Sequence, residues 1–124
     1  MFRDHVAGVL ASQDPSGAWW TVMNRAGDTD NYLETSATAL FAYGLARAYR
    51  YGFVGEPKLS AAKRAVEAAR SKVILDEQGR PVVTGISQGT EPSTYEVYTS
   101  RELQDDRNYG VGAVILALIE TSGL

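Results

Sequence analysis

Hydrophobic and polar positions along the chain predict two amphipathic helices. Residues 2–13 and 58–75 each gather apolar side chains on one stripe, with charged side chains over the rest of the circumference. Spacings of three and four residues between apolar positions are typical of a helix that packs one side against a core. We therefore expect both segments to be helices with a solvent-facing side.

Two further segments, residues 32–51 and 109–122, are apolar or small on every side. The first has no charged residue between Glu34 and Arg47, and the second has none before Glu120. A helix without a polar face is one that other helices surround. Four helices are too few to surround two of them on all sides. One-sided and apolar helices alternate along the chain, and this alternation predicts helical hairpins in two layers, with further helices around the inner pair. Alanine-rich helices in a compact four-helix bundle would give the same pattern.

The chain between residues 76 and 100 breaks the helical periodicity. Two short β-rich pieces, residues 81–86 and 94–99, flank a segment rich in Gly, Pro and Ser, which predicts one small β-hairpin. The expected fold class is all-α with this hairpin as the only sheet. The length favours a single domain that spans residues 1–124.

Composition narrows the kinds of site and partner. The chain is 44% hydrophobic and 22% charged, with a net charge of −3 and no basic patch, so we expect neither nucleic acid nor a membrane as partner. No apolar run is long enough to span a bilayer. With no cysteine and one histidine, no metal site is expected. The first residues lack a signal-peptide pattern, which favours a cytoplasmic location.

Candidate chemistry lies in the loops that lead into the two apolar helices. In a two-layered ring of helical hairpins, these loops meet at one rim. They supply aromatic rings beside carboxylates, amides and a cation, and such groups suit a sugar because rings stack on a pyranose while polar groups bind its hydroxyls. The candidate substrate-binding residues are Trp19, Trp20, Asn31, Glu34, Tyr95, Tyr98 and Arg101.

Each candidate also has a structural interpretation. One of the two indoles, Trp19 or Trp20, is expected in the core. Glu34 opens a helix, where acidic residues are favoured as caps and by the helix dipole. Arg101 is the one cation near the rim, available to an acidic substrate or to neighbouring aspartates. The sequence shows no nucleophile–base constellation, phosphate loop or dinucleotide fingerprint.

Several stretches occur in an order that is typical of one enzyme family. The most specific are NYLETSATALFAYGLARAYRYGF and YGVGAVILALIE, accompanied by QDPSGAWWTVMN, DEQGRPVVTGIS and TYEVYTSRELQDDRN. With these stretches the chain resembles the C-terminal portion of unsaturated glucuronyl and rhamnogalacturonyl hydrolases, glycoside hydrolase families 88 and 105. Because these families fold as (α/α)6 barrels of six helical hairpins, the resemblance implies about a third of such a barrel here.

The resemblance also implies a reaction. In these families an aspartate protonates C4 of a terminal 4,5-unsaturated uronic acid left by polysaccharide lyases, water adds at C5, and the resulting hemiketal opens to release the sugar. No metal or organic cofactor takes part. The family motifs that carry this aspartate and its His, Trp and Arg neighbours match no segment here. No catalytic role is therefore transferred to Asp28, Asp30, Asp105 or Asp106.

The whole polypeptide is open to two hypotheses. In the first, residues 1–124 are the C-terminal fragment of a longer hydrolase that is inactive alone, and an N-terminal portion covers its bare helix faces. In the second, the chain is a non-catalytic sugar-binding module, or one that forms homo-oligomers through those faces. Whether the substrate comes from pectin or from a glycosaminoglycan stays open.

Overall fold

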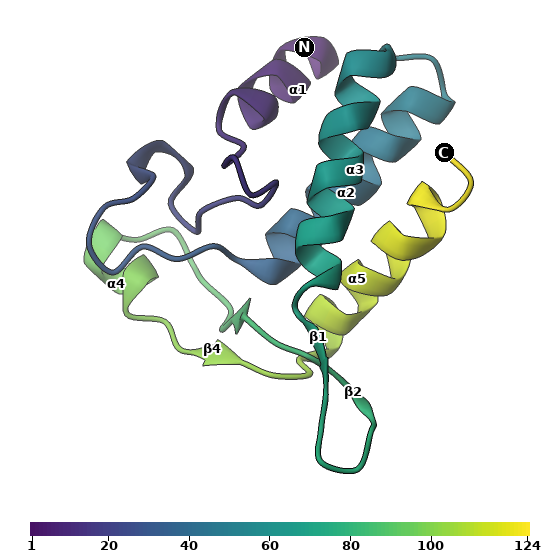
Figure 1. Ribbon diagram of the computed structural model, residues 1–124. Coiled ribbons are helices and arrows are strands. Elements are labelled where there is room, and N and C mark those ends of the chain that lie inside the picture. Colours follow the sequence, from purple (N-terminus) through teal and green to yellow (C-terminus); the bar gives the residue numbers. More distant parts are fainter.

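The computed structural model describes all of residues 1–124 and contains five α-helices (Figure 1). The four longer helices confirm the segments that the periodicity predicts. The elements in chain order are α1 (Phe2–Ala11), the 3-10 helix η1 (Met23–Arg25), α2 (Thr35–Arg50), α3 (Glu56–Arg70), β1 (Val73–Leu75), β2 (Pro81–Val83), β3 (Ile86–Ser87), α4 (Tyr95–Thr99), β4 (Leu103–Gln104) and α5 (Asn108–Thr121).

Helix α2 is delimited by residues that satisfy or interrupt its backbone. At its start the carboxylate of Glu34 accepts hydrogen bonds from the amides of Ser36 and Ala37, at 3.1 and 2.6 Å. These amides are among the first N–H groups of the helix, which have no partner within it. After its end Gly52 has a φ of 72°, a value that favours glycine. The helix that is capped in this way lies at the centre of the molecule.

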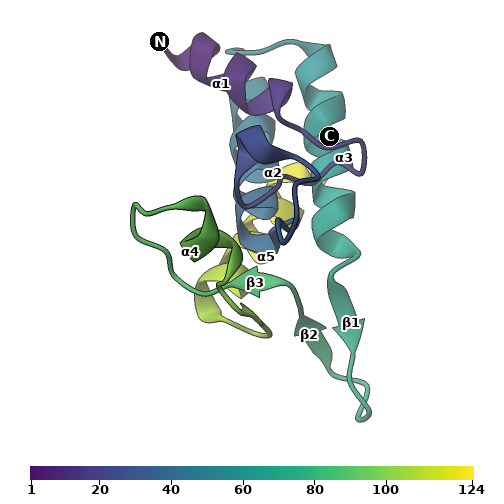
Figure 2. The same ribbon diagram turned by 90° about the vertical axis from the view of Figure 1, so that its left-hand side faces the viewer.

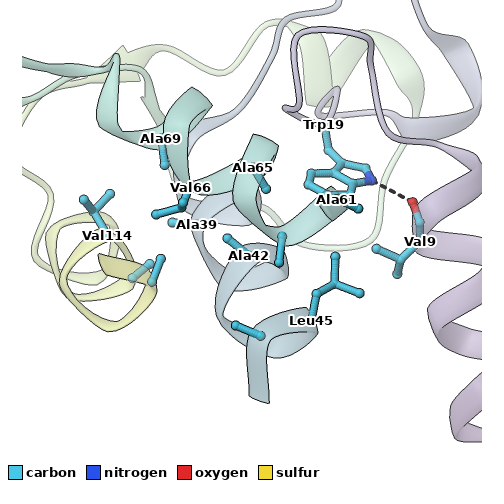
Figure 3. Close-up of a cluster of buried hydrophobic side chains, with 14 of the residues drawn as sticks. Val9, Trp19, Ala39, Ala42, Leu45, Ala61, Ala65, Val66, Ala69 and Val114 are labelled. Carbon is cyan, nitrogen blue, oxygen red and sulfur yellow. Dashed lines mark hydrogen bonds between the residues drawn. The ribbon is translucent and has the colours of Figure 1, made fainter. Parts of the chain in front are cut away.

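Small side chains allow α2 to pack closely against both α3 and α5, which also contact each other. Ala39, Ala42 and Ala46 of α2 are fully buried, and α3 and α5 meet them with small residues such as Ala65 and Ala117. Figure 3 shows Ala39, Ala42 and Ala65 among the side chains where the three helices meet. The core is therefore rich in alanine, and its largest member is Trp19, which is 0% exposed.

The sheets differ from the single hairpin that the sequence predicts. β1 and β2 form an antiparallel hairpin with Val73 opposite Val83, and it projects from the helices (Figure 2). Because β1 occupies residues 73–75, the predicted helix 58–75 is wrong at its end. β3 pairs with β4, with Ile86 opposite Gln104.

Residues 94–99 are not a strand, so the predicted pairing of 81–86 with 94–99 is wrong. They form the short helix α4 instead. A five-residue segment of alternating apolar and polar residues is too short for periodicity to separate a strand from one helical turn. Thr99 donates its hydroxyl to the carbonyl of Tyr95 at 3.1 Å, a bond between residues four apart that suits the helix.

Helix α5 buries only one side. Gly110, Ala113, Val114 and Ala117 face the core, whereas Ile115, Leu116 and Ile119 are 50%, 45% and 67% exposed. We call Ile115, Leu116 and Ile119 the α5 stripe. No helix of the chain combines the length and hydropathy that crossing a membrane requires.

Candidate functional site

A pocket of about 300 Å³ opens beside the N-terminal end of α2. Its walls come from the loop before α2, the first turns of α2 and α5, and residues 87–90 after β3. The sequence predicts that the loops before the two apolar helices share one rim, and the structure does bring them into contact, since the Tyr95 hydroxyl donates to the carbonyl of Thr29. Of the two loops, the first lines the pocket, with Trp20 and Glu34, whereas Tyr109 belongs to α5 itself. The remaining lining residues are Thr21, Met23, Ser36, Ala37, Phe41, Ser87, Gln88, Gly89 and Thr90.

Trp20 forms an aromatic wall of this pocket and is held from behind. Its backbone pairs with Leu33 in an isolated antiparallel bridge, and its indole nitrogen donates to the carboxylate of Asp14 at 3.0 Å. Asp14 belongs to a tight turn, where the backbone N–H of Ser16, followed by the Ser16 hydroxyl, lowers the pKa of the Asp14 carboxyl. The indole is therefore anchored through an ionised acceptor while its ring stays partly exposed.

Glu34 is buried in the floor of the pocket, with 5% of its surface exposed. Its carboxylate accepts hydrogen bonds from the amides of Ser36, Ala37 and Ser87 and from the hydroxyl of Ser36, at distances of 2.6 to 3.1 Å. It takes part in none of the ion pairs of the chain. Its charge is therefore met by hydrogen-bond donors at a helix N-terminus.

Three hydroxyl groups in the pocket wall, those of Ser36, Ser87 and Tyr109, already have partners for their hydrogens. Ser36 donates to the Glu34 carboxylate, at 3.0 and 2.9 Å to its two oxygens, and Tyr109 donates to the carbonyl of Ser87. Ser87 donates to the carbonyl of Gln88 at 2.9 Å, and its Oγ lies 2.9 Å from the Tyr32 hydroxyl. The oxygens of Ser36 and Tyr109, which line the pocket, thus retain acceptor capacity.

Of the seven substrate-binding residues that the sequence predicts, Trp20 and Glu34 line the pocket. Trp19 does not, since its ring is fully buried, packs on Phe41 with ring centroids 4.9 Å apart, and offers no face to a ligand. The Asn31 side chain is also occupied elsewhere. Its amide group donates to the carbonyls of Val22 and Arg25 at 3.1 and 2.7 Å, which closes the loop before α2.

The other three candidates lie around α4 and outside the pocket lining. The Tyr95 hydroxyl donates to the carbonyl of Thr29 at 2.6 Å. Burial raises the pKa of Tyr95, with the nearby Asp28 carboxylate adding to the effect. The Tyr98 hydroxyl accepts from the amide of Ser93 at 3.0 Å. Arg101 has its Nε buried without a hydrogen-bond partner.

Sequence reasoning missed the polar wall formed by Ser36 and residues 87–90, as well as Tyr109. The available signal is the Gly- and Ser-containing segment GISQGT, which the hairpin prediction assigns in part to a turn. The pairing of β3 with β4 places this segment against α2 instead. The chain has no group of three His, Cys, Asp or Glu side chains placed to hold a metal ion.

The curated relatives of this chain are longer than it is. Protein Atu3128 of Agrobacterium fabrum is 34% identical over 133 residues, which covers 96% of this chain and 57% of the relative. The 24.9 kDa protein in the picA locus of Rhizobium radiobacter matches with the same values. The chain therefore spans a little more than half the length of these two relatives.

The solved structures that resemble this chain are longer still. A family 105 glycoside hydrolase of C. acetobutylicum superposes with a TM-score of 0.87 at 23% identity, over 96% of this chain and 36% of its own. Possible members of that family from Salmonella enterica and Klebsiella pneumoniae give TM-scores of 0.80 and 0.77, at 29% and 34% identity. The Salmonella and Klebsiella matches each cover 93% of this chain and less than a third of the solved chain.

These likenesses identify the fold. The helices of this chain form part of an (α/α)6 barrel, about a third of it. The family profile named Glycosyl Hydrolase Family 88 matches residues 1–124 from end to end. The chain therefore belongs to glycosyl hydrolase family 88.

Proposed function

We propose that this chain supplies a sugar-binding wall of a glycoside hydrolase that releases 4,5-unsaturated uronic acid from lyase-generated oligosaccharides. The observation that carries the proposal is the pocket at the N-terminus of α2, in a chain of family 88. It combines the rings of Trp20, Phe41 and Tyr109 with hydroxyl and backbone groups. Such a combination suits a pyranose, which has apolar faces and a rim of hydroxyls.

The polar wall favours a ligand that donates hydrogen bonds. Ser36 and Tyr109 already donate their hydrogens to Glu34 and to the Ser87 carbonyl, so toward the pocket their oxygens act as acceptors. Sugar hydroxyls supply such donors. The buried Glu34 carboxylate makes no ion pair, and a second carboxylate beside it would be repelled. We therefore assign this wall to the uncharged part of the oligosaccharide.

The catalytic acid comes, on this proposal, from another part of the barrel. Glu34 is the only acidic residue that lines the pocket, and its two oxygens already accept from four donor groups. A general acid needs a proton within hydrogen-bond reach of the substrate. The chain alone is thus expected to bind sugar without turning it over.

Further helices of a family 88 or 105 chain are, we propose, the partners that complete the barrel. The α5 stripe presents three large aliphatic side chains to solvent. On the opposite flank, an apolar groove of about 300 Å³ lies between α1 and α2, lined by Phe2, Val9, Leu40 and Gly44 among others. The solved chains extend well beyond the part matched here, which supplies helices for both flanks.

A chimaera tests this proposal. The segment of the Klebsiella pneumoniae protein that matches this chain is replaced by residues 1–124. Turnover of unsaturated galacturonyl-rhamnose and of an unsaturated chondroitin disaccharide is followed by loss of double-bond absorbance. We expect no turnover by the chain alone, turnover by the chimaera, and a raised KM in the chimaera with Trp20→Ala. Turnover by the isolated chain, or an unchanged KM in the folded Trp20→Ala chimaera, would contradict the proposal.

A second candidate function is a non-catalytic sugar-binding module. It is favoured by the pocket at the N-terminal end of α2, where residues 1–124 alone bring aromatic rings and polar groups together. Sedimentation of the isolated chain separates the two candidates. A monomer that melts cooperatively favours the independent module, whereas association through the apolar flanks favours a part of a larger barrel.

A further inference from the structure

We propose that Glu34 is a positioning residue, which fixes Ser36 and residues 87–90 in the pocket wall and neither binds the sugar nor donates a proton to it. The part of this inference that concerns sugar affinity rests on the proposed function. The part that concerns the wall itself does not, because it depends only on the contacts of the Glu34 carboxylate.

Glu34 joins two segments that are far apart in sequence. Its Oε1 accepts from the amide of Ser36 at 3.1 Å and from the amide of Ser87, 53 residues away, at 3.0 Å. Its Oε2 accepts from the amide of Ala37 at 2.6 Å. Both oxygens also accept from the Ser36 hydroxyl. One carboxylate thus caps α2, orients a pocket hydroxyl and holds the end of β3.

These contacts leave Glu34 little capacity for a ligand. A carboxylate offers about four lone-pair sites, and the three amides and the Ser36 hydroxyl already use that number. The group is also buried, with 5% of the residue exposed. A ligand hydroxyl would have to displace a backbone amide from the carboxylate, and a buried amide without a partner is costly.

The Ser87 amide depends on Glu34 because of its place in the β3–β4 pair. Gln88, the next residue, donates its amide to the carbonyl of Glu102 at 3.1 Å. Successive amides along an antiparallel strand point to opposite sides, so the Ser87 amide points away from β4. Its acceptor is the Glu34 carboxylate. Without Glu34, residues 87–90 would lose their bond to α2 at the edge of the pocket.

The residues before β3 are held independently, which confines the effect of Glu34 to the wall. The amide of Thr35 donates to the carbonyl of Gly85 at 3.0 Å, and its hydroxyl donates to the carbonyl of Thr84 at 2.8 Å. A Cβ on Gly85 would lie 2.8 Å from that hydroxyl oxygen, so the two segments approach closely there. Loss of Glu34 therefore leaves residues 84–85 bonded to α2 and removes the bond of the Ser87 amide to the start of α2, while Tyr109 and Glu102 still bond to Ser87 and Gln88.

Two substitutions of Glu34 separate its bond to the Ser87 amide from its capping of α2. In Glu34→Asp the carboxylate is one methylene shorter, so it still caps α2 but no longer reaches Ser87. In Glu34→Gln one oxygen becomes an amide nitrogen, which cannot accept. The matched control is Glu120→Gln, because Glu120 is a poorly exposed carboxylate that forms ion pairs with Arg47 and Arg50 at the other end of α2.

The measurement is amide hydrogen exchange by NMR on the 124-residue chain, with a titration of unsaturated galacturonyl-rhamnose. We expect Glu34→Asp to lower the protection of Ser87 by roughly tenfold relative to Ala37, and to raise the disaccharide Kd by roughly fivefold or more. We expect Glu34→Gln to lower the protection of both amides. In Glu120→Gln the ratio of Ser87 to Ala37 protection stays at the wild-type value.

The outcomes distinguish the positioning role of Glu34 from the proposed binding of sugar. Wild-type Ser87 protection in Glu34→Asp would overturn the positioning role, as would wild-type sugar affinity in a variant that has lost that protection. If the wild-type chain itself gives no shift with the disaccharide, the proposed function fails for the isolated chain. In that case the exchange data alone decide whether Glu34 holds the wall.

Discussion

The indole nitrogen of Trp19 donates a hydrogen bond to the carbonyl oxygen of Val9 at 2.7 Å. Figure 3 shows this bond reaching from the loop before α2 to α1. The backbone amide of Trp19 donates in turn to the hydroxyl of Thr38 in α2, at 3.1 Å. A single buried residue thus connects α1, the loop that carries Trp20, and the helix whose N-terminus forms the pocket.

Replacing Trp19 by Phe should destabilise the fold more than the same change at the neighbouring indole. Trp19→Phe removes the bond to Val9 and leaves part of a fully buried volume unfilled, which we expect to cost about 2–3 kcal/mol of unfolding free energy. Trp20 is partly exposed, and Trp20→Phe should cost within about 1 kcal/mol. Urea denaturation of both variants measures the difference. Equal costs would show that Trp19 does not connect the elements in this way.

Gly110 and Gly112 of α5 provide a matched pair of substitutions. A Cβ on Gly110 would overlap the side chain of Ile86, which is fully buried, whereas a Cβ on Gly112 meets no atom within 4 Å. We expect Gly110→Ala to destabilise the chain by about 1–3 kcal/mol through overpacking. Gly112→Ala should instead stabilise it by up to about 1 kcal/mol, because alanine is the better helix former.

Denaturant midpoints of the two glycine variants give opposite signs if Ile86 sits against α5 as described. Ile86 is also the residue that brings β3 to α5, so its contact with Gly110 bears on the pocket. Stabilisation by Gly110→Ala would mean that α5 and β3 lie further apart than the structure has them.

Stability should fall in acid partly through two turn carboxylates. The Ser16 backbone N–H lowers the pKa of Asp14, and the Arg80 backbone N–H lowers the pKa of Asp76, both from an ordinary value of 3.8. A carboxyl whose pKa is lower in the folded state contributes stability that is present above its unfolded pKa and lost as the pH falls through the folded pKa. The loss from both residues is therefore expected below the ordinary value of 3.8.

Asn substitutions isolate the contribution of each acid to this loss. Between about pH 5 and pH 2 the unfolding free energy of Asp14→Asn should fall less steeply than that of the wild type. Asp76 is half-buried and accepts from the amides of Gln78 and Arg80, so Asp76→Asn should reduce the slope as well. Thermal melts across this range, with Glu77→Gln as an exposed acidic control, measure the slopes. Identical slopes for Asp14→Asn and the control would contradict the role of the Ser16 turn.

Sequence predicts the long helices of this fold because two of them carry an apolar stripe at helical spacing and the other two are long uncharged runs of apolar and small residues. It also predicts that the loops before α2 and α5 meet, because both helices are apolar inner helices and the loops that lead into inner helices lie at the same end of a layered ring. The hairpin prediction failed where the evidence was a few residues: the alternation of Tyr95, Val97 and Thr99 fits a strand and a single helical turn equally. Tertiary contacts decided between them.

The candidate site shows the same limit at the level of single side chains. Sequence places aromatic and polar residues in the right loops, but it does not say which of two adjacent indoles turns inward. The structure answers with Trp19 buried and Trp20 in the pocket. Ser36 and Ser87 escaped notice because serine is common in caps and turns, and their role depends on a carboxylate 53 residues from one of them.

The α5 stripe should govern how the isolated chain associates. Ile119 is 67% exposed, so Ile119→Lys removes apolar surface without opening the core, and its unfolding free energy should stay within about 0.5 kcal/mol of the wild type. If further helices normally cover the stripe, the wild-type chain should associate in sedimentation experiments and Ile119→Lys should shift it toward monomer. In the chimaera the same change should lower stability, because a lysine would then be buried among helices.

The control is Leu75→Lys, since Leu75 is 70% exposed on the projecting hairpin. Equal effects of the two lysines on association would mean that the stripe is one exposed apolar patch among several, with no partner of its own.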